Sequence, residues 1–323
     1  MAGSGEERDG VSLTNLDQPL FDGSGATKRD LVDYLDAMRD RMLPVLRDRP
    51  LSVIRALRDQ PPFMQKNLPK YTPDWVARVS RWAEASHREV AYPLCDDRRT
   101  LLWFANQRAI EYHVPLVRTE AWDRPTHLVL DLDPPEGKPF GAAVAAARLI
   151  RTVLADAGMS GAVKTSGAKG LHVFVPLEPA ATTEEVAAAT RAIAARGARL
   201  DPDLATTAYV IQEREGKVFL DSTRAGWATV VAAYSPRVRP GATVSYPLAW
   251  ADLDRVTPAD FTVHTAPGLL GGRDPWAESM PAPQRLHPDL VAEGREIPIA
   301  RVAAMHAGKR RARARREAAD PTG

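Results

Sequence analysis

The segment His127–Pro135 ends an apolar run with two aspartates, and it constrains the fold more than any other part of the chain. Its alternating leucines predict a buried β-strand over residues 127–133. Because side chains alternate faces along a strand, Asp131 and Asp133 point the same way while the leucines point into the core. Adjacent carboxylates repel each other unless a proton or a cation lies between them, and Mg2+ and Mn2+ prefer such oxygen ligands. The pattern favours a metal site, although the two prolines that follow also fit a strand ending in an ordinary exposed turn.

The composition is that of a globular chain without a membrane segment. Its 323 residues are 44% hydrophobic, enough for a sizeable core in one large domain or two lobes. No apolar run approaches the roughly 20 residues that span a bilayer, and the polar segment Met1–Gly10 is unlike a signal peptide. We therefore expect a cytoplasmic protein with no membrane partner. The single cysteine, Cys95, excludes an intramolecular disulfide and a cysteine-based zinc site.

Positive charge is concentrated at one end of the chain. The net charge is only +2, but the segment Lys309–Arg316 is strongly basic. A polyanionic partner would therefore be held by local basic patches or by this tail, and not by a uniformly positive surface. We expect the tail, residues 305–323, to be disordered without a partner.

Hydrophobic periodicity and turn residues predict a mixed α/β fold, because strands alternate with helices. Thr27 is suited to cap a helix that ends near Pro44, and Gly158 to end an alanine-rich helix. The proline-rich stretch 59–73 predicts a loop. The other expected elements are a helix over 74–89, a strand over 127–133, a helix over 140–157, strands over 162–165 and 171–177, a helix capped by Thr183, and a strand over 217–221.

A second chemically suggestive segment is Lys164–His172, which contains two glycines and two lysines. A loop of this kind can present backbone N–H groups to phosphate oxygens, and Lys169 and His172 add charge and directional donors. Alternation along the outgoing strand places His172 on the face opposite the apolar residues. Taken alone, the loop fits a glycine-rich hairpin with a solvated lysine better than a phosphate site.

Two further features carry charge downstream of this loop. Asp221 ends the strand expected over 217–221, and a third carboxylate on a neighbouring strand would complete a ligand set for two metals in phosphoryl transfer. An isolated aspartate after a strand is otherwise a common turn residue. Arg237 and Arg239 share a face in an extended segment, which suits phosphate binding, although pairing with surface carboxylates is an ordinary alternative role.

Several enzyme classes place an Asp-x-Asp pair at the end of a strand. In a haloacid-dehalogenase-type phosphatase the first aspartate is a nucleophile, but a small turn with a hydroxyl residue usually follows, where this chain has Pro134-Pro135. A metal-binding pair of a glycosyltransferase is a further alternative. Neither class accounts for the glycine-rich loop together with Asp221.

The motifs, in this order, resemble the archaeo-eukaryotic primase superfamily, and specifically the polymerase domain of bacterial non-homologous end-joining ligase D and its stand-alone relatives. The likeness extends over most of the chain, and several independent motifs in register are hard to obtain by chance. The motifs are Asn15 with Thr14, Phe63-Met64-Gln65-Lys66-Asn67, Tyr92-Pro93-Leu94, Ala105-Asn106-Gln107, Glu111-Tyr112-His113, Leu130-Asp131-Leu132-Asp133-Pro134, Lys164 to His172, Val218-Phe219-Leu220-Asp221 and Ala233-Tyr234-Ser235-Pro236-Arg237.

The resemblance implies a centre for nucleotidyl transfer. Asp131, Asp133 and Asp221 would bind two divalent ions, Mn2+ or Mg2+, and catalyse attack of a primer 3′-hydroxyl on the α-phosphate of a nucleoside triphosphate. The residues implied for the triphosphate and its sugar are His113, Lys164, Ser166, Lys169, Gly170, His172, Arg224 and Arg237.

The same resemblance implies contacts with DNA. Asn15 and Lys28 match a pocket for the 5′-phosphate at a gap or break, whereas Gln18 stands where a lysine of this pocket is common. The residues that match the template side are Phe63, Met64 and Lys66. Met64 replaces the second of two adjacent phenylalanines, so stacking there is expected to be softer. After Asp221 the family has Trp-Ser-Gln-Asn where this chain has Ser222 to Ala225, and Arg224 would take over a polar contact to the nucleotide.

The resemblance implies a primase-polymerase fold with a central RRM-like catalytic sheet. The catalytic domain would cover residues 1–304, with an N-terminal α/β module at about 11–120, the sheet at about 121–264 and a C-terminal extension at about 265–304. We expect a stand-alone DNA/RNA polymerase, since no Lys-x-Asp-Gly ligase motif is present. It would fill short gaps with ribonucleotides during end joining or excision repair, near the nucleoid, with a separate DNA ligase and other repair factors. A non-catalytic DNA-end binding module of the same fold is the alternative, and a phosphatase the more distant one.

Overall fold

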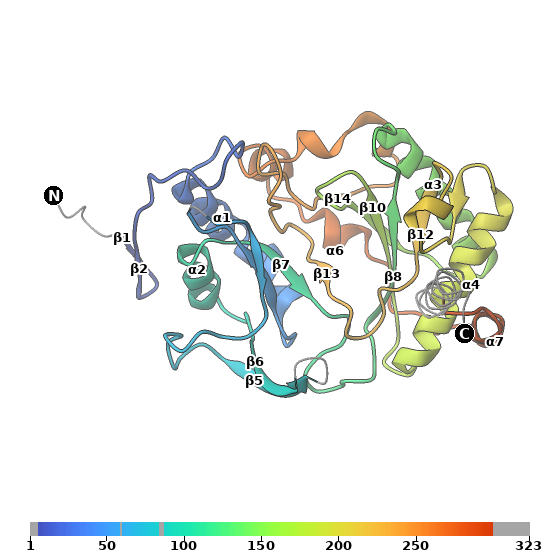
Figure 1. Ribbon diagram of the computed structural model, residues 1–323, viewed down its shortest axis with the longest axis horizontal. Helices are drawn as coiled ribbons and strands as arrows, with labels where there is room; N and C mark the ends of the chain where they lie inside the picture. Colours follow the sequence, from blue (N-terminus) through green and yellow to red (C-terminus); the bar gives the residue numbers. More distant parts are fainter. Residues whose placement is uncertain (1–5, 59, 84–86, 300–323) are drawn as a thin grey trace, which may run out of the picture.

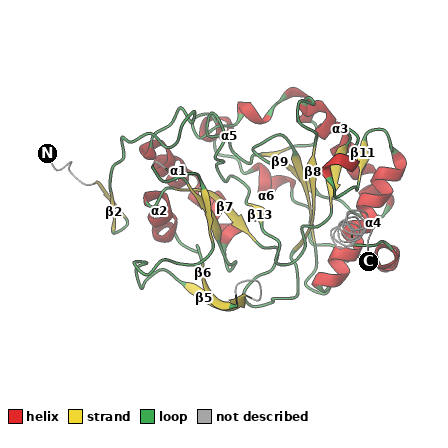
Figure 2. Ribbon diagram, in the orientation of Figure 1, coloured by secondary structure: helices red, strands yellow, loops and turns green. Residues whose placement is uncertain are grey.

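The computed structural model describes residues 6–58, 60–83 and 87–299 (Figure 1). Two halves lie side by side, the N-terminal one at the left of the view and the half that begins near His127 at the right. Each half is built around its own sheet, and helices alternate with strands in both (Figure 2). The expected mixed α/β class is confirmed.

The second half contains a split β-α-β unit. Its elements are β8 (His127–Asp133), α3 (Phe140–Asp156), β9 (Ala162–Thr165), β10 (Leu171–Pro176), α4 (Thr183–Leu200) and β12 (Val218–Asp221). The strands pair antiparallel in the order β12-β8-β10-β9, so the first strand of the unit lies between the fourth and the third. This is the order of ferredoxin-like and RRM-like sheets, as expected. The edges are extended by β11 (Ala205–Thr206) and β14 (Pro247–Leu248).

The leucine side of β8 faces the helices and anchors the core. Leu128, Leu130 and Leu132 have no exposed surface, and α3 and α4 both pack against β8 and β12. The opposite face of the sheet carries Asp131 and Asp133, and it turns toward the N-terminal half. Side chains along β8 alternate between the two faces of the sheet. Because the leucines are buried against the helices, the carboxylates must point to the opposite face.

The N-terminal half holds a four-stranded sheet in the order β13-β7-β3-β4, with helices and two hairpins around it. Its elements are β1 (Glu6–Arg8), β2 (Val11–Leu13), α1 (Lys28–Leu46), β3 (Ser52–Arg55), β4 (Phe63–Gln65), β5 (Arg78–Ala83), β6 (Arg88–Pro93), α2 (Arg98–Asn106) and β7 (Ala109–Val114). The fourth strand, β13 (Val230–Val231), comes from the chain that follows β12, so it links the two halves.

The C-terminal segments return to both halves. They are the 3-10 turns Leu253–Arg255 and Pro258–Asp260, and the helices α5 (Ala266–Leu270), α6 (Pro275–Ser279) and α7 (Pro288–Glu296). A further 3-10 turn, Ile211–Glu213, lies between β11 and β12. α7 lies along α4, and it approaches so closely that a Cβ added to Gly294 would lie 1.8 Å from the carbonyl oxygen of Ala188. The basic tail after residue 299 lies outside the described residues. None of the described helices is long and apolar enough to cross a membrane.

Most of the expected elements are confirmed with small shifts. Thr27 caps α1 through a capping box, but the helix continues through Pro44 to Leu46 because its apolar side stays buried to the end. Gly158 follows α3 with a φ of 68°, as a helix-ending glycine should. The N-cap of α4 is Thr182, one residue before the expected position. The expected loop over 59–73 contains the short strand β4, which is paired with β3.

The helix expected over 74–89 is wrong, because this stretch forms the hairpin of β5 and β6. Six cross-strand pairs join the two strands. The guanidinium of Arg81 lies 3.8 Å from the ring centroid of Trp227, and the ring of Tyr92 lies 6.4 Å from the same indole. These partners are distant in the chain, so local periodicity could not reveal them.

We predict that Gly294→Ala destabilises the protein. The new methyl group meets backbone and not a flexible side chain, so α7 must move away from α4, at a cost of about 1–3 kcal/mol in free energy of unfolding. The matched control is Gly268→Ala, also in a helix, where a Cβ meets nothing within 4 Å and should stabilise slightly. Urea unfolding of both variants measures this, and equal stabilities would contradict the close approach.

Candidate active site

A single row of polar residues crosses the sheet of the second half. Asp221 on β12 is the register partner of Asp131 on β8, which is the partner of His172 on β10, which in turn pairs with Lys164 on β9. Residues in register lie on the same face, with Cβ atoms about 4.5–5.5 Å apart. Asp133 lies on this face too, two residues after Asp131. The pairing of four strands therefore assembles the site, and no loop is needed to bring these side chains together.

The carboxylates of this row are buried and close enough to affect one another. Asp131 is 9% exposed and Asp221 6%. Burial and the adjacent charges of Asp131 and Asp221 raise the pKa of Asp133 to about 6. Burial opposes the charge of Asp131 as well, but His172 and Arg224 outweigh it and lower its pKa. The cluster thus holds more negative charge than the buried site favours, which is the condition under which a cation binds.

Arg224 supplies positive charge to the two opposed aspartates. Its Nε lies 3.5 Å from Oδ2 of Asp131 and 3.4 Å from Oδ2 of Asp221, and its side chain is 39% exposed. Among the residues that the structure describes, no three His, Cys, Asp or Glu side chains are arranged to hold a metal ion as they stand. The donor chemistry nonetheless fits a hard divalent ion, since three carboxylates share one face and one of them resists ionisation. Such an ion would compete with Arg224 for the same oxygens.

The glycine-rich loop between β9 and β10 is compact. The Ser166 hydroxyl accepts hydrogen bonds of 3.2 Å from the backbone N–H groups of Ala168 and Gly170. A Cβ on Gly170 would lie 2.2 Å from the carbonyl oxygen of Leu132, so only glycine allows the loop this close to β8. Lys169 is half-exposed, with its Nζ 3.7 Å from Glu136, and is free to face a ligand.

Lys164 differs from Lys169, because it has no exposed surface. Its Nζ lies 2.8 Å from Nδ1 of His172 and donates to the hydroxyl of Ser245 at 2.6 Å. An ammonium group only donates, so Nδ1 of His172 accepts and the proton of the neutral ring lies on Nε2, 3.2 Å from Oδ1 of Asp131. Burial and the positive charge of Lys164 lower the pKa of His172 to about 4, which keeps the ring neutral. In this structure Lys164 reaches the site only through His172.

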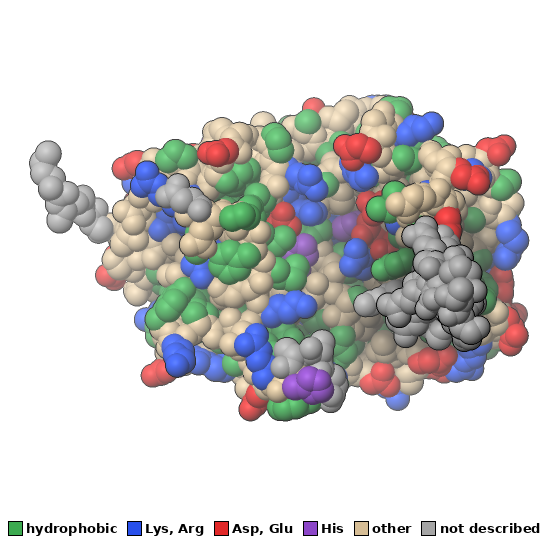
Figure 3. Space-filling view, viewed as in Figure 1, with side chains coloured by type: hydrophobic (Ala, Val, Ile, Leu, Met, Phe, Trp, Pro, Cys, Tyr) green, Lys and Arg blue, Asp and Glu red, His purple; other side chains and the backbone are tan. Residues whose placement is uncertain are grey.

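The other expected nucleotide contacts lie on the facing wall. His113 on β7 and Arg237 both contact the buried carboxylate of Glu111, and Arg237 Nη1 also donates to the carbonyl of Ser166. Figure 3 shows acidic, basic and histidine side chains gathered near the middle of this face of the molecule, between the two halves. The structure thus places all eight residues expected for the triphosphate on or behind the walls of one site.

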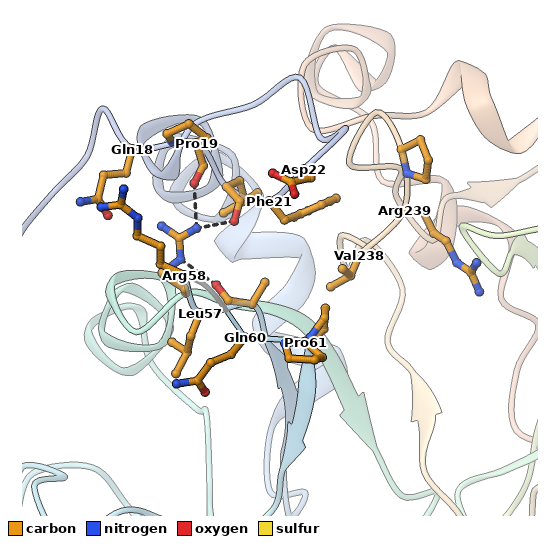
Figure 4. A pocket seen from close by; sticks show the side chains of 15 residues that line it. Gln18, Pro19, Phe21, Asp22, Leu57, Arg58, Gln60, Pro61, Val238 and Arg239 are labelled. Carbon is orange, nitrogen blue, oxygen red and sulfur yellow. Dashed lines mark hydrogen bonds between the residues drawn. The ribbon is translucent and has the colours of Figure 1, made fainter.

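A separate cavity of about 780 Å3 lies beside Gln18 (Figure 4). Of the five residues expected to contact DNA, none lines it. Gln18, Arg58 and Arg108 line it, and Figure 4 shows Gln18 and Arg58 on one side and Arg239 on the other. Arg108 adopts a φ of 59° and donates only to backbone carbonyls, those of Pro19, Leu20 and Ala56.

The expected DNA contacts differ in their exposure. Asn15 and Lys66 are exposed, as are Phe63 at 37% and Met64 at 44%. Lys28, however, is 3% exposed, and its Nζ donates to the carbonyl of Thr14 and to Oδ1 of Asn106. Burial and the nearby Arg108 lower its pKa to about 8. Lys28 therefore lies beneath the surface, and it does not line the cavity.

Comparison with known protein families shows which family this chain belongs to. The family model of the LigD primase-polymerase domain matches residues 27–276. The chain belongs to the LigD primase-polymerase domain family. Members are metal-dependent nucleotidyltransferases, so the chain is an enzyme of the primase-polymerase class, as the resemblance implied.

Individual relatives agree with the family assignment. The chain is 37% identical over 261 residues to the bifunctional non-homologous end joining protein LigD of Bacillus subtilis, covering 79% of this chain and 41% of that protein. It is 36% identical over 267 residues to the multifunctional LigD of Mycobacterium bovis, covering 79% of this chain and 34% of that protein. The chain therefore spans less than half the length of these relatives. The solved polymerase domain of Mycobacterium tuberculosis ligase D in complex with DNA superposes with a TM-score of 0.76 and 32% identity, over 85% of this chain and 100% of that one.

Three residues of this LigD-type site were not assigned roles from the sequence. They are Glu111, Ser245 and Arg108. Glu111 stands two residues before the expected contact His113 on one strand, and that spacing could have indicated a shared face. Ser245 and Arg108 gave no local signal, because their partners lie far away in the chain.

We predict that Lys164→Met leaves the protein folded but lowers primer extension about tenfold or more, since the tautomer of His172 is no longer fixed. The thioether side chain has a similar volume, and removing a buried charge offsets part of the lost hydrogen bonding. Urea unfolding and a primer-extension assay measure the two effects. Lys217→Met, at a lysine paired with Glu215, is the control; unchanged extension in Lys164→Met would contradict the supporting role.

Proposed function

We propose that this domain adds nucleotides, preferentially ribonucleotides, to primer 3′ ends in short gaps or breaks of DNA during repair. The observation that carries this is the row across the sheet, in which Asp221 faces Asp131 and Asp133 shares the same side, next to a compact glycine-rich loop. Relatives named for non-homologous end joining support this pathway, and the relative solved with DNA supports the substrate. Excision repair would offer the same kind of gap.

In this proposal the three aspartates would hold two divalent ions, Mn2+ or Mg2+, which activate the 3′-hydroxyl and neutralise the leaving group when bound. The chain's own cations handle the triphosphate. Lys169 is half-exposed on the loop and would reach the triphosphate from there, while His113 and Arg237 would approach from the other side. Arg224 is partly exposed, so it can leave the aspartates and contact the nucleotide.

The cavity beside Gln18 is the proposed site for the 5′-phosphate on the far side of a gap. Arg58 and Arg108 line it, and the buried Lys28 adds positive charge from below. A cluster of cations suits a phosphate dianion. Phe63 and Met64 are exposed on β4, where an apolar side chain can stack against an unpaired template base, and Lys66 would contact the backbone. A polymerase leaves a nick after filling a gap, so a DNA ligase activity must consume its product.

We predict that Asp131→Asn and Asp221→Asn each abolish extension, because the donor set for the ions is broken, while gel-shift binding of gapped DNA persists. The assay is incorporation of a labelled ribonucleotide opposite a templating base in a gapped duplex with Mn2+. Asp254→Asn, at a surface aspartate paired with Arg148, is the control.

The outcomes of this assay separate the alternatives. Extension that survives both substitutions would overturn the catalytic assignment. A wild-type protein that binds gapped DNA and never extends a primer would identify a DNA-end binding module. Phosphate release from a small phosphoester without DNA would identify a phosphatase.

We further predict that Gln18→Lys tightens binding to gapped DNA that carries a 5′-phosphate by about tenfold, because it adds a charged donor to the cavity. The gain should vanish when the 5′ end is a hydroxyl. Gln212→Lys adds the same charge at an exposed position outside the cavity and should not discriminate between the two ends. Equal gains for the two ends in fluorescence-anisotropy titrations would exclude this cavity as the phosphate pocket.

A further inference from the structure

Glu111 is a buried carboxylate that the proposed chemistry does not use. It lies on β7 in the N-terminal half, and its side chain is 4% exposed. Three groups converge on it. Oε2 lies 2.8 Å from Nε2 of His113 and 3.0 Å from Nε of Arg237, and Oε1 accepts a 2.9 Å hydrogen bond from the backbone N–H of Val238.

The carboxylate keeps its charge in this environment. Burial alone would favour the protonated form, but His113, Arg237 and the N–H of Val238 lower the pKa of Glu111 to about 2. An ionised carboxylate accepts hydrogen bonds and donates none. The Nε2 proton of His113 must therefore point at Glu111, which fixes the ring's orientation and leaves Nδ1 for another partner.

Arg237 makes a charge contact with Glu111 and a hydrogen bond to the glycine-rich loop. Nε lies against Glu111, and Nη1 donates to the carbonyl of Ser166, where the glycine-rich loop begins. The loop passes so close that a Cβ on Gly167 would lie 2.6 Å from Cγ of Arg237. Through Arg237, the carboxylate of one half of the molecule thus sets the position of the loop of the other half.

Apart from the N–H of Val238, the backbone in this region is held by contacts that do not involve Glu111. Val230 and Val231 of β13 pair with Val114 and His113 of β7, and the N–H of Tyr112 bonds to the hydroxyl of Ser235. These contacts hold the segment before Arg237 against β7. Glu111 therefore affects mainly the orientation of two side chains, and its removal should leave the fold in place.

We propose that Glu111 is a positioning residue for the incoming nucleoside triphosphate. It holds His113 and Arg237 in the orientation in which both meet the ligand, and it joins the two halves at the glycine-rich loop. This inference rests on the proposed function, since it takes His113 and Arg237 as nucleotide contacts.

The test is Glu111→Gln in the full chain, which keeps the volume and removes the charge. We expect KM for ATP in primer extension to rise about tenfold with kcat changed less than about threefold, because ground-state contacts with the triphosphate are lost. The double variant Glu111→Gln with Arg237→Gln should lose less affinity for ATP than the sum of the two single losses, since part of the effect of Glu111 acts through Arg237 and the rest through His113. Asp36→Asn, at a carboxylate of α1 paired with Arg98, is the control for loss of an ion pair and should leave KM unchanged.

A second readout does not require extension. Equilibrium dialysis of ATP with Mn2+ should show the same loss of affinity in Glu111→Gln. If the wild-type protein binds ATP and extends no primer, the proposed function fails while this measurement still tests Glu111. An unchanged affinity, or a fall in kcat and melting temperature together at constant KM, would overturn the positioning role.

Discussion

Two buried aspartates placed opposite each other on neighbouring strands are the constraint on which the rest of the site depends. Like charges directly across a sheet repel, and burial strengthens the repulsion. Asp131 and Asp221 occupy this arrangement because the leucines of β8 and Val218 and Leu220 of β12 pack on the helix side of the sheet. A register shift of one residue would bury the carboxylates in the core, so the core that stabilises the sheet also enforces the repulsion. Basic side chains around the two aspartates offset this repulsion.

Cations reach the aspartates from the two ends of the same row. Lys164 acts from the β9 side through His172, and Arg224 acts from the loop that follows β12. In the other half of the molecule the charges are arranged the opposite way. There the buried carboxylate of Glu111 is contacted by His113, Arg237 and a backbone N–H. One wall of the site thus carries the aspartates with the basic groups beside them. The other wall carries His113 and Arg237, which both contact the buried carboxylate of Glu111. A triphosphate with divalent ions carries both signs of charge and is complementary to both walls.

The sequence revealed the parts of this arrangement that depend on short-range patterns. Alternation along residues 127–133 predicted both the strand and the common face of Asp131 and Asp133, and the glycines of 164–172 predicted a tight loop. The row itself depends on which residues of four strands are paired, and register is a property of the assembled sheet. Lys164 illustrates the difference, because the sequence treated it like Lys169, yet one is fully buried and the other half-exposed. The hairpin of β5 and β6 was missed for the same reason, since Trp227, against which Arg81 stacks, lies far away in the chain.

The two cations beside the aspartates differ in how easily they can leave. Lys164 is enclosed by the sheet, and withdrawing it would leave Ser245 and the ring of His172 without their partner, so its amine is a permanent part of the site. Burial lowers the pKa of this amine well below its usual value. Arg224 is 39% exposed and makes only charge contacts of 3.4 and 3.5 Å to the carboxylates, so solvent can replace it at small cost. A site with only fixed cations would be neutralised and would not attract a metal. A site with none would be unstable before a metal binds. In the proposed function, one fixed amine and one exchangeable cation would let the folded enzyme tolerate its opposed carboxylates and still bind divalent ions together with the nucleotide.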